Sequence, residues 1–230
     1  MGYDERTIAP GIELWRNTGS AGPQRILPDG CLDLILVGER LLVAGPDTAA
    51  RVHPAGPPAT VTGVRLHAGR GPMLLGVPAD ELRDRTVPLE DVWGDARARV
   101  LAERVADDPG VALAEWATSS EDGNPFGELV RSLLDRGRTV GEVADAVGYS
   151  PRQLHRRLLP VFGYGPQHLG RVLRLVRAVT DADAGQSWSD AAQRAGFVDQ
   201  AHLVREVRAL TGVTPTQLRQ ERVRSVQDAA

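Results

Sequence analysis

The 230-residue chain contains no lysine, so all 27 of its basic residues are arginines. Its single cysteine, Cys31, excludes a disulfide within one chain and suits a reducing compartment. No apolar run approaches the roughly 18 residues that a membrane-spanning helix needs. The first six residues are acidic where a secretion signal would be basic. We therefore expect a soluble, cytoplasmic protein without a membrane partner.

Signatures of catalysis are also scarce. The chain has no Gly-rich phosphate loop and no G-x-S-x-G motif. His53 and His67 are the only histidines before residue 124, too few for the clustered ligands of a metal-dependent oxygenase. A lone cysteine that begins an apolar strand, as Cys31 does, is more typical of a core residue than of a nucleophile. The sequence therefore predicts no enzyme, no catalytic residue, no metal site and no cofactor.

Charge is distributed unevenly along the chain. The formal net charge of −3 by itself argues against a nucleic-acid-binding protein. Residues 1–123 hold 12 Arg and 19 acidic residues, a net −7, whereas residues 124–230 hold 15 Arg and 11 acidic residues, a net +4. The stretch between Asp145 and Asp181 has no acidic residue and contains Arg152, Arg156, Arg157, Arg171, Arg174 and Arg177. Such a local excess is typical of a surface that binds phosphate.

The first half mixes strand and helix patterns, separated by a proline-rich loop at residues 47–58. Polar and helix-breaking residues at 121–125 mark the predicted boundary between a domain at residues 1–120 and one at residues 124–224. The patterns predict strands at residues 31–37, 40–44, 61–66 and 73–77, and helices at residues 80–85, 94–107 and 111–118.

The second half is helical with short breaks. Thr139 and Glu142 have the spacing of a capping box, and Ser150 precedes a proline at the first position of the next helix. Asp199 is the predicted cap of a later helix, and either Ser187 or Ser189 begins the one before it. Predicted helices span residues 126–136, 139–147, 166–181 and 187–195, and others begin after Ser150, after Asp199 and at Pro215.

An internal repeat is the clearest feature of the second half. Residues 143–149 align with residues 191–197 at an offset of 48. One inserted residue later the offset is 49, which pairs Leu154 with Leu203, Arg156 with Arg205, Gly163 with Gly212, and Pro166 with Pro215. Each copy reads as a short helix, a Gly-aromatic turn and a capped second helix, the order of a helix-turn-helix unit.

Two functions remain open at this point. The repeat is compatible with a helical scaffold for protein contacts, but such arrays usually stack several copies to bury their faces. Only two copies occur here, and each has arginine on its second helix. This arrangement favours DNA binding over the scaffold.

The second half resembles the DNA-binding domain of the AraC/XylS family of bacterial transcription regulators, over a little under half of the chain. The second copy carries most of the family signature, at residues 195–197, 199–203 and 211–215. The first copy matches at residues 148–154 and 163–166.

Four positions depart from the family pattern. Leu203 and Val207 stand where members usually have an aromatic residue, and Ala201 stands where serine is common. Pro160 lies late in the first recognition helix, where proline should kink or end the helix. We expect these departures to alter packing detail and to leave the fold unchanged.

The resemblance implies that each recognition helix enters a major groove of double-stranded DNA, roughly 34 Å apart across the linking helix. Arginine can pair with guanine and glutamine with adenine, whereas Ala201 and Val204 can at most touch a thymine methyl group. The first copy is therefore the expected principal reader, and the second contributes more positioning. The predicted DNA-binding residues are Arg152, Gln153, His155, Arg156, Arg157, Gln200, Ala201, Val204 and Arg205, with helix caps at the DNA face in Ser150 and Asp199.

Four other residues of this half have a second interpretation. His202 is expected to pack or cap rather than to read bases. Arg171, Arg174 and Arg177 follow each other at three-residue intervals on the linking helix. They are expected either to touch phosphate or to form a solvated face.

The first half resembles an uncharacterised domain that is often fused to such DNA-binding domains, at residues 28–34, 76–78 and 89–94. The resemblance implies effector sensing or self-association, in a reduced cupin-like barrel. The predicted fold class is thus α+β: a small, mostly antiparallel β domain with helices, then an all-α domain of two helix-turn-helix units joined by a long helix. Expected partners are DNA, a small-molecule effector, RNA polymerase if the protein is an activator, and a second copy in a homodimer.

Overall fold

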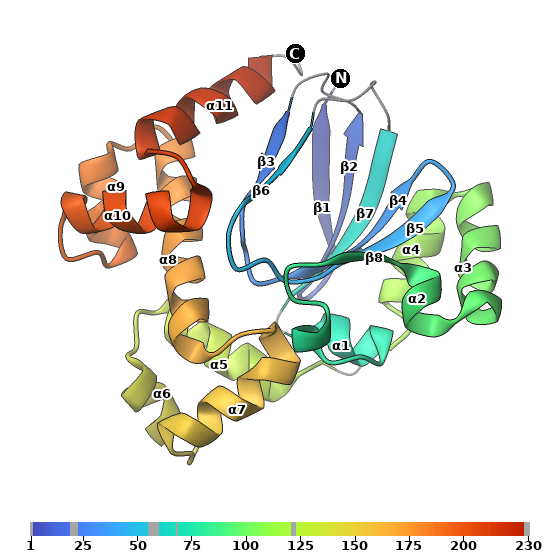
Figure 1. The fold of residues 1–230 in the computed structure, drawn as a ribbon, viewed down its shortest axis with the longest axis horizontal. Helices are drawn as coiled ribbons and strands as arrows, with labels where there is room; N and C mark the ends of the chain where they lie inside the picture. Colours follow the sequence, from blue (N-terminus) through green and yellow to red (C-terminus); the bar gives the residue numbers. More distant parts are fainter. Residues whose placement is uncertain (1, 19–22, 55–59, 68, 121–122, 228–230) are drawn as a thin grey trace.

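The computed structural model describes residues 2–18, 23–54, 60–67, 69–120 and 123–227, with side chains as far as Arg222. Figure 1 shows a β-sheet part, flanked by α1 to α4, beside a helical part that runs from α5 to α11. The predicted α+β class, with an antiparallel β domain followed by a helical domain, is confirmed.

The main sheet has six strands in the order β1-β2-β7-β4-β5-β8, and all neighbours are antiparallel. The strands are β1 (Tyr3–Ala9), β2 (Ile12–Thr18), β4 (Leu32–Val37), β5 (Arg40–Ala44), β7 (Thr60–Leu66) and β8 (Thr86–Pro88). A separate antiparallel pair joins β3 (Gln24–Ile26) to β6 (Arg51–His53). Within the described strands, β1 and β8 remain the edges of the main sheet, so it is open rather than closed by its own hydrogen bonds.

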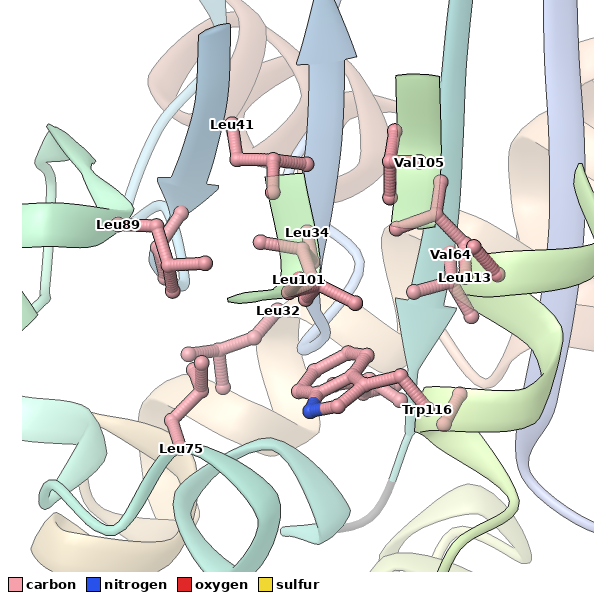
Figure 2. Close-up of a cluster of buried hydrophobic side chains, with 14 of the residues drawn as sticks. Leu32, Leu34, Leu41, Val64, Leu75, Leu89, Leu101, Val105, Leu113 and Trp116 are labelled. Atoms are coloured by element: carbon pink, nitrogen blue, oxygen red, sulfur yellow. The ribbon is translucent and has the colours of Figure 1, made fainter. Parts of the chain in front are cut away.

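One face of the main sheet is apolar because side chains alternate along each strand. Val64 of β7 lies opposite Leu14 of β2 and Leu34 of β4, so all three point to the same side. Helices α3 (Asp95–Asp107) and α4 (Pro109–Ala117) cover this side and bury their own apolar faces against it. Figure 2 shows this core, built from Leu32, Leu34, Leu41, Val64, Leu75, Leu89, Leu101, Val105, Leu113 and Trp116.

The opposite face carries a half-buried ionic cluster centred on Arg65, the next residue of β7. The Arg65 guanidinium lies 3.0 Å from Glu5 Oε1 through Nη1, and 3.2 Å from Asp29 Oδ2 and 3.5 Å from Asp33 Oδ1 through Nε. The indole Nε1 of Trp15 donates a hydrogen bond to Asp33 at 2.8 Å. Burial raises the pKa of Asp33 to about 7, and the nearby Arg65 charge limits the rise.

Two hydrophobic cores form the helical part, and both pack on one long helix, α8 (Pro166–Asp183). Leu169 and Leu173 belong to the first core, while Leu175 and Val179 belong to the second. The other helices are α5 (Pro125–Asp135), α6 (Val140–Ala146), α7 (Pro151–Phe162), α9 (Trp188–Ala195), α10 (Gln200–Thr211) and α11 (Pro215–Gln227). The long linking helix predicted from the sequence is therefore the spine of this half (Figure 1).

The predicted strands at residues 31–37, 40–44 and 61–66 are confirmed as β4, β5 and β7, and α3 and α4 match the predicted helices. The predicted strand at residues 73–77 is wrong, because α1 (Arg70–Leu75) occupies it. The predicted helix at 80–85 reduces to a 3₁₀ turn, η1 (Ala79–Glu81).

Several elements have no counterpart in the sequence prediction. Strand β1 lies at an edge with five exposed residues in succession, so it lacks the apolar alternation that reveals a strand. Strands β3 and β6 have three residues each, and their paired residues are 25 to 29 positions apart in the sequence. Strand β8 and helix α2 (Leu89–Trp93) were not predicted either. The end of the predicted loop, residues 55–58, and the boundary residues 121–122 lie outside the described residues.

The Asp33 carboxyl should make the stability of the β part depend on pH. Its pKa in the folded protein lies above its ordinary value of 3.8, so its contribution to stability is complete below about pH 4 and is lost as the pH rises through about 7. We expect Asp33→Asn, which cannot ionise, to flatten the profile of unfolding free energy between pH 4 and pH 7. Urea denaturation at several pH values in that range measures the unfolding free energy, with Asp4→Asn on the exposed β1 as control. An equally steep profile in Asp33→Asn would contradict the assignment.

Candidate nucleic-acid interface

The first helix-turn-helix unit consists of α6 and α7, and each helix begins in a capping box. The Thr139 side chain accepts from the backbone of Glu142, whose carboxylate accepts in return from Thr139. The Ser150 hydroxyl accepts from Gln153 N at 3.3 Å, and Gln153 Oε1 accepts from Ser150 N at 2.9 Å. The predicted cap at Ser150 is therefore confirmed, and it sets the start of the first recognition helix, α7.

The second unit consists of α9 and α10. Ser187, rather than Ser189, caps α9. Asp199 caps α10 by accepting from His202 N at 2.6 Å. The His202 ring lies edge-on to Phe197 with centroids 5.4 Å apart, and its Nδ1 accepts weakly from Val198 N at 3.4 Å. These contacts support the expectation that His202 packs within the unit.

The repeat in the sequence is also a repeat in hydrogen bonding. Tyr149 N donates to Ala144 O at 2.9 Å in the first unit, and Phe197 N donates to Ala192 O at 2.9 Å in the second. The donors of the two bonds are 48 residues apart in the sequence, and so are the acceptors. The two units therefore have the same turn, and the offset read from the sequence is a structural equivalence.

The glycines of the repeat have positive φ values, which residues with a side chain rarely adopt. The turn glycines Gly148 and Gly196 have φ of 71° and 80°. Gly163 and Gly212, which end the two recognition helices, have φ of 78° and 76°. Pro160 was expected to kink or end the helix; α7 continues through it to Phe162, so it does not end the helix there, and the kink stays a prediction. Pro160 lies in the last turn, where little of the helix remains to be broken.

Each recognition helix buries one face and exposes the other. Helix α7 buries Leu154, Leu158 and Phe162, and α10 buries Leu203, Val207 and Leu210. Of the predicted DNA-binding residues, Val204 is half-buried, and the others are exposed: Arg152, Gln153, His155, Arg156, Arg157, Gln200, Ala201 and Arg205. The β part does not cover these exposed faces.

Some exposed residues of α7 already have partners within the chain. The Gln153 side-chain oxygen belongs to the capping box. The Arg157 guanidinium lies over the Tyr149 ring, 4.6 Å from its centroid. The His155 ring lies so close to Gly165 that a Cβ there would overlap it. Within the described residues Arg152 and Arg156, one turn apart, form no hydrogen bond or ion pair, so both guanidiniums are available to a ligand.

The arginines of α8 are half-buried and contact other helices of the domain, which supports neither of the two interpretations the sequence left open. Arg171 Nε pairs with Glu206 of α10 at 2.7 Å. Arg177 donates to Asp135 Oδ1 at 2.7 Å and to Ala195 O at 3.0 Å. Arg174 lies against the Phe197 ring with its Nε buried. These side chains therefore join α5, α9 and α10 to the spine, so part of the basic excess seen in the sequence is structural.

The β part contacts the C-terminal end of both recognition helices. Arg83 Nη1 donates to Gly163 O at 3.0 Å, and Arg25 Nη1 donates to Thr211 O at 2.7 Å. Ala50 N also donates to Leu210 O at 2.7 Å. Carbonyls at a helix C-terminus lack intrahelical partners and bear partial negative charge, which suits a guanidinium. Sequence reasoning missed both arginines, because their partners lie 80 and 186 residues away.

Tyr164 extends this contact between the two parts. Its side chain is buried, and its hydroxyl forms no hydrogen bond to the described residues. It lies close to Gly30 of the β part and packs against the His168 ring, with centroids 4.7 Å apart. Burial raises the pKa of Tyr164 and, together with the nearby Arg171, lowers that of His168.

Cys31 is 4% exposed, as expected of a core residue. Burial raises the pKa of its thiol well above the ordinary value, which disfavours the reactive thiolate. Among the described residues, no group of three or more His, Cys, Asp or Glu side chains is placed to hold a metal ion. No helix in the described ranges is both long and apolar enough to cross a membrane.

The hydrogen bonds of Arg177 predict that its substitution destabilises the fold more than substitution of an exposed arginine does. We expect Arg177→Gln to lower the free energy of unfolding by about 1–3 kcal/mol, because it removes charged hydrogen bonds to two helices. Arg156→Gln, at an exposed and unpaired residue, should change it by less than about 0.5 kcal/mol. Urea denaturation of both variants measures the difference, and equal losses would show that Arg177 does not brace the domain.

Comparison with known domain families finds two matches in this chain. A helix-turn-helix domain family matches residues 143–221, and a domain of unknown function (DUF6597) matches residues 12–88. No curated protein sequence matches.

Solved structures share the fold at low identity. ToxT from Vibrio cholerae O395 has a TM-score of 0.50 at 9% identity, covering 93% of this chain and 98% of that one. A second ToxT crystal form gives 0.49 at 9% identity, with 96% and 99% covered. ToxT bound to (E)-4-(8-methylnaphthalen-1-yl)but-3-enoic acid gives 0.49 at 8%, with 96% and 99% covered. Residues 143–221 thus match a helix-turn-helix domain family and residues 12–88 match the DUF6597 family, in a chain whose fold is similar to that of ToxT.

Proposed function

We propose that this protein binds double-stranded DNA in a sequence-specific manner by placing α7 and α10 in successive major-groove segments. The observation that carries the proposal is the pair Arg152 and Arg156, exposed, unpaired and one turn apart on α7. Arg205 occupies the equivalent position to Arg156 on α10 and is likewise exposed. Guanidiniums presented by a recognition helix suit the O6 and N7 acceptors of guanine.

The internal bonds of α8 support a fixed spacing of the two units. Because Arg171 and Arg177 tie the second unit and α5 to α8, and the first unit packs on the same continuous helix, a single chain can present two recognition helices together. We therefore propose residues 124–224 as the DNA-binding domain, reading two groove segments about one DNA turn apart. A homodimer is not needed for this, and contact with RNA polymerase follows only if the protein activates transcription.

Regulation by a small-molecule effector is the proposed role of residues 1–120. The supporting observation is that this part contacts the end of each recognition helix, through Arg83 at Gly163 and Arg25 at Thr211. A ligand that shifts the β part can change the placement of α7 and α10 only through its different affinity for two arrangements. The domain composition is that of a regulator, and we propose no catalytic activity.

DNA binding itself is tested by titrating the full chain with DNA from upstream of its own gene. We expect log affinity to fall linearly with log salt concentration, at about 0.9 per phosphate neutralised. The measurement is fluorescence anisotropy at several salt concentrations. Absence of any salt-dependent binding would favour the alternative, a helical-repeat scaffold for protein contacts.

Base reading by Arg156 makes a sharper prediction. Arg156→Ala should weaken binding to the cognate site by about 10- to 100-fold and binding to random DNA far less, because a base contact is lost. Arg99→Ala, an equal loss of charge on the exposed surface of α3, is the matched control. Equal losses on cognate and random DNA would instead make Arg156 a phosphate contact.

The two units should contribute unequally. Val204 is half-buried and Ala201 carries only a methyl group, so α10 presents fewer polar groups to base edges than α7 does. We expect single base-pair substitutions in the segment bound by α7 to cost more affinity than those in the segment bound by α10. A substitution scan of the footprinted site measures this, and equal costs in the two segments would refute the asymmetry.

A further inference from the structure

A cavity of about 300 Å³ opens among the helices of the β part, on the side of the main sheet that α3 and α4 cover. This volume is at the lower end of the range of small-ligand pockets. Its lining comes from α1, α2, α3 and the end of α4: Leu74, Trp93, Arg97, Val100, Leu101, Arg104, Trp116 and Ser119. The cavity is separate from the exposed faces of α7 and α10.

Two tryptophans define the apolar wall of the cavity. Trp93 and Trp116 lie edge to face with ring centroids 5.9 Å apart. Trp93 Nε1 is already bonded to Leu75 O at 2.8 Å, so this indole offers its ring rather than its N–H. Val100 at the rim is 61% exposed, an apolar side chain that the fold leaves uncovered. These surfaces suit a planar, apolar group.

The charge at the rim is positive. Arg97 lies over the Trp93 ring, 3.9 Å from its centroid, and forms no ion pair or hydrogen bond within the described part of the chain. Arg104, by contrast, is paired with Glu115 at 2.6 Å. Arg97 already occupies a face of Trp93, which disfavours a cationic ligand there, and its free donors suit a carboxylate.

From these features we infer that this cavity binds a small aromatic carboxylate, with its ring against Trp93 and Trp116 and its anionic group on Arg97. The inference names the site and chemical class of the effector, and so rests on the function proposed above. Neither domain match assigns a ligand or a site to this region.

The cavity is connected to the first recognition helix through α1. Leu74 of α1 lines the cavity, and the Trp93 bond to Leu75 ties the same helix to α2. At its other end, α1 is preceded by its N-cap Gly69, which lies so close to Val161 of α7 that a Cβ on Gly69 would overlap it. A ligand that moves Leu74 therefore displaces a helix in direct contact with α7.

Calorimetric titration of the full chain, without DNA, tests the site with 4-phenylbutyrate as probe. We expect saturable one-to-one binding that Arg97→Gln weakens by about tenfold or more, because a charge-assisted hydrogen bond is lost. Arg99→Gln, an exposed arginine of the same helix outside the cavity, should bind as the wild type does. The neutral analogue 4-phenylbutan-1-ol should bind more weakly than the carboxylate and be insensitive to Arg97→Gln.

A second variant tests whether 4-phenylbutyrate binds in the cavity, independently of Arg97. Val100→Trp changes an exposed rim residue, so it should fold normally, and it should abolish binding of 4-phenylbutyrate by filling the entrance. Absence of saturable binding to the wild type, or binding unaffected by both variants, overturns the inference. A wild-type dimer in sedimentation that Val100→Trp dissociates would also overturn it, by making a second copy the occupant.

The outcomes separate this inference from the proposed function. If the protein binds DNA with the expected salt dependence but not 4-phenylbutyrate, the ligand site fails and the regulator stands. If it binds 4-phenylbutyrate but no DNA, the cavity stands and the regulator fails. If both hold, 4-phenylbutyrate should change the affinity for the cognate DNA, and the change should disappear in Arg97→Gln.

Discussion

The packing of two helix-turn-helix cores on the single helix α8 is the constraint on which the DNA-binding surface depends. Leu173 belongs to one core and Leu175 to the other, so one rigid element supports both units. Arg171 and Arg177 add charged bonds to helices on either side. Since a continuous helix has a fixed rise of about 1.5 Å per residue, the relative position of α7 and α10 is set by the chain itself.

The β part contacts the helical part at the C-terminal end of each recognition helix. A helix C-terminus has carbonyls that no intrahelical N–H can reach. Arg83 and Arg25 meet these carbonyls at nearly equivalent positions of the repeat, Gly163 and Thr211. One domain therefore contacts both DNA-binding units by the same chemistry, which gives a change in the β part a route to both.

The two faces of the main sheet differ in polarity. The apolar side of the sheet, under α3 and α4, supplies the core and the nearby cavity. The other side holds Arg65 among Glu5, Asp29 and Asp33, charges that are costly to bury unless paired. Packing stability and ionisable chemistry are thus separated by the thickness of one sheet, which allows one side to bind a ligand without disturbing the charges of the other.

The sequence by itself determined the helical half well. The repeat, the caps at Thr139, Ser150 and Asp199, and the turn glycines are local signals, because caps and turns are made by residues within a few positions of each other. The DNA-facing residues of α7 and α10 were given by the resemblance to the AraC/XylS family motif. The edge strand β1 was missed because its residues are exposed and carry no alternation.

Only the tertiary structure decided what the arginines do. In sequence, Arg156 and Arg177 belong to the same basic stretch, yet one is exposed and unpaired, while the other joins three helices. The contacts of Arg25 and Arg83 with the helix ends, and the placing of Arg97 beside two tryptophans, link distant positions. Charge can be counted from a sequence, but a charged side chain's partner depends on long-range packing, and that is why composition identified a basic domain and the fold identified its free arginines.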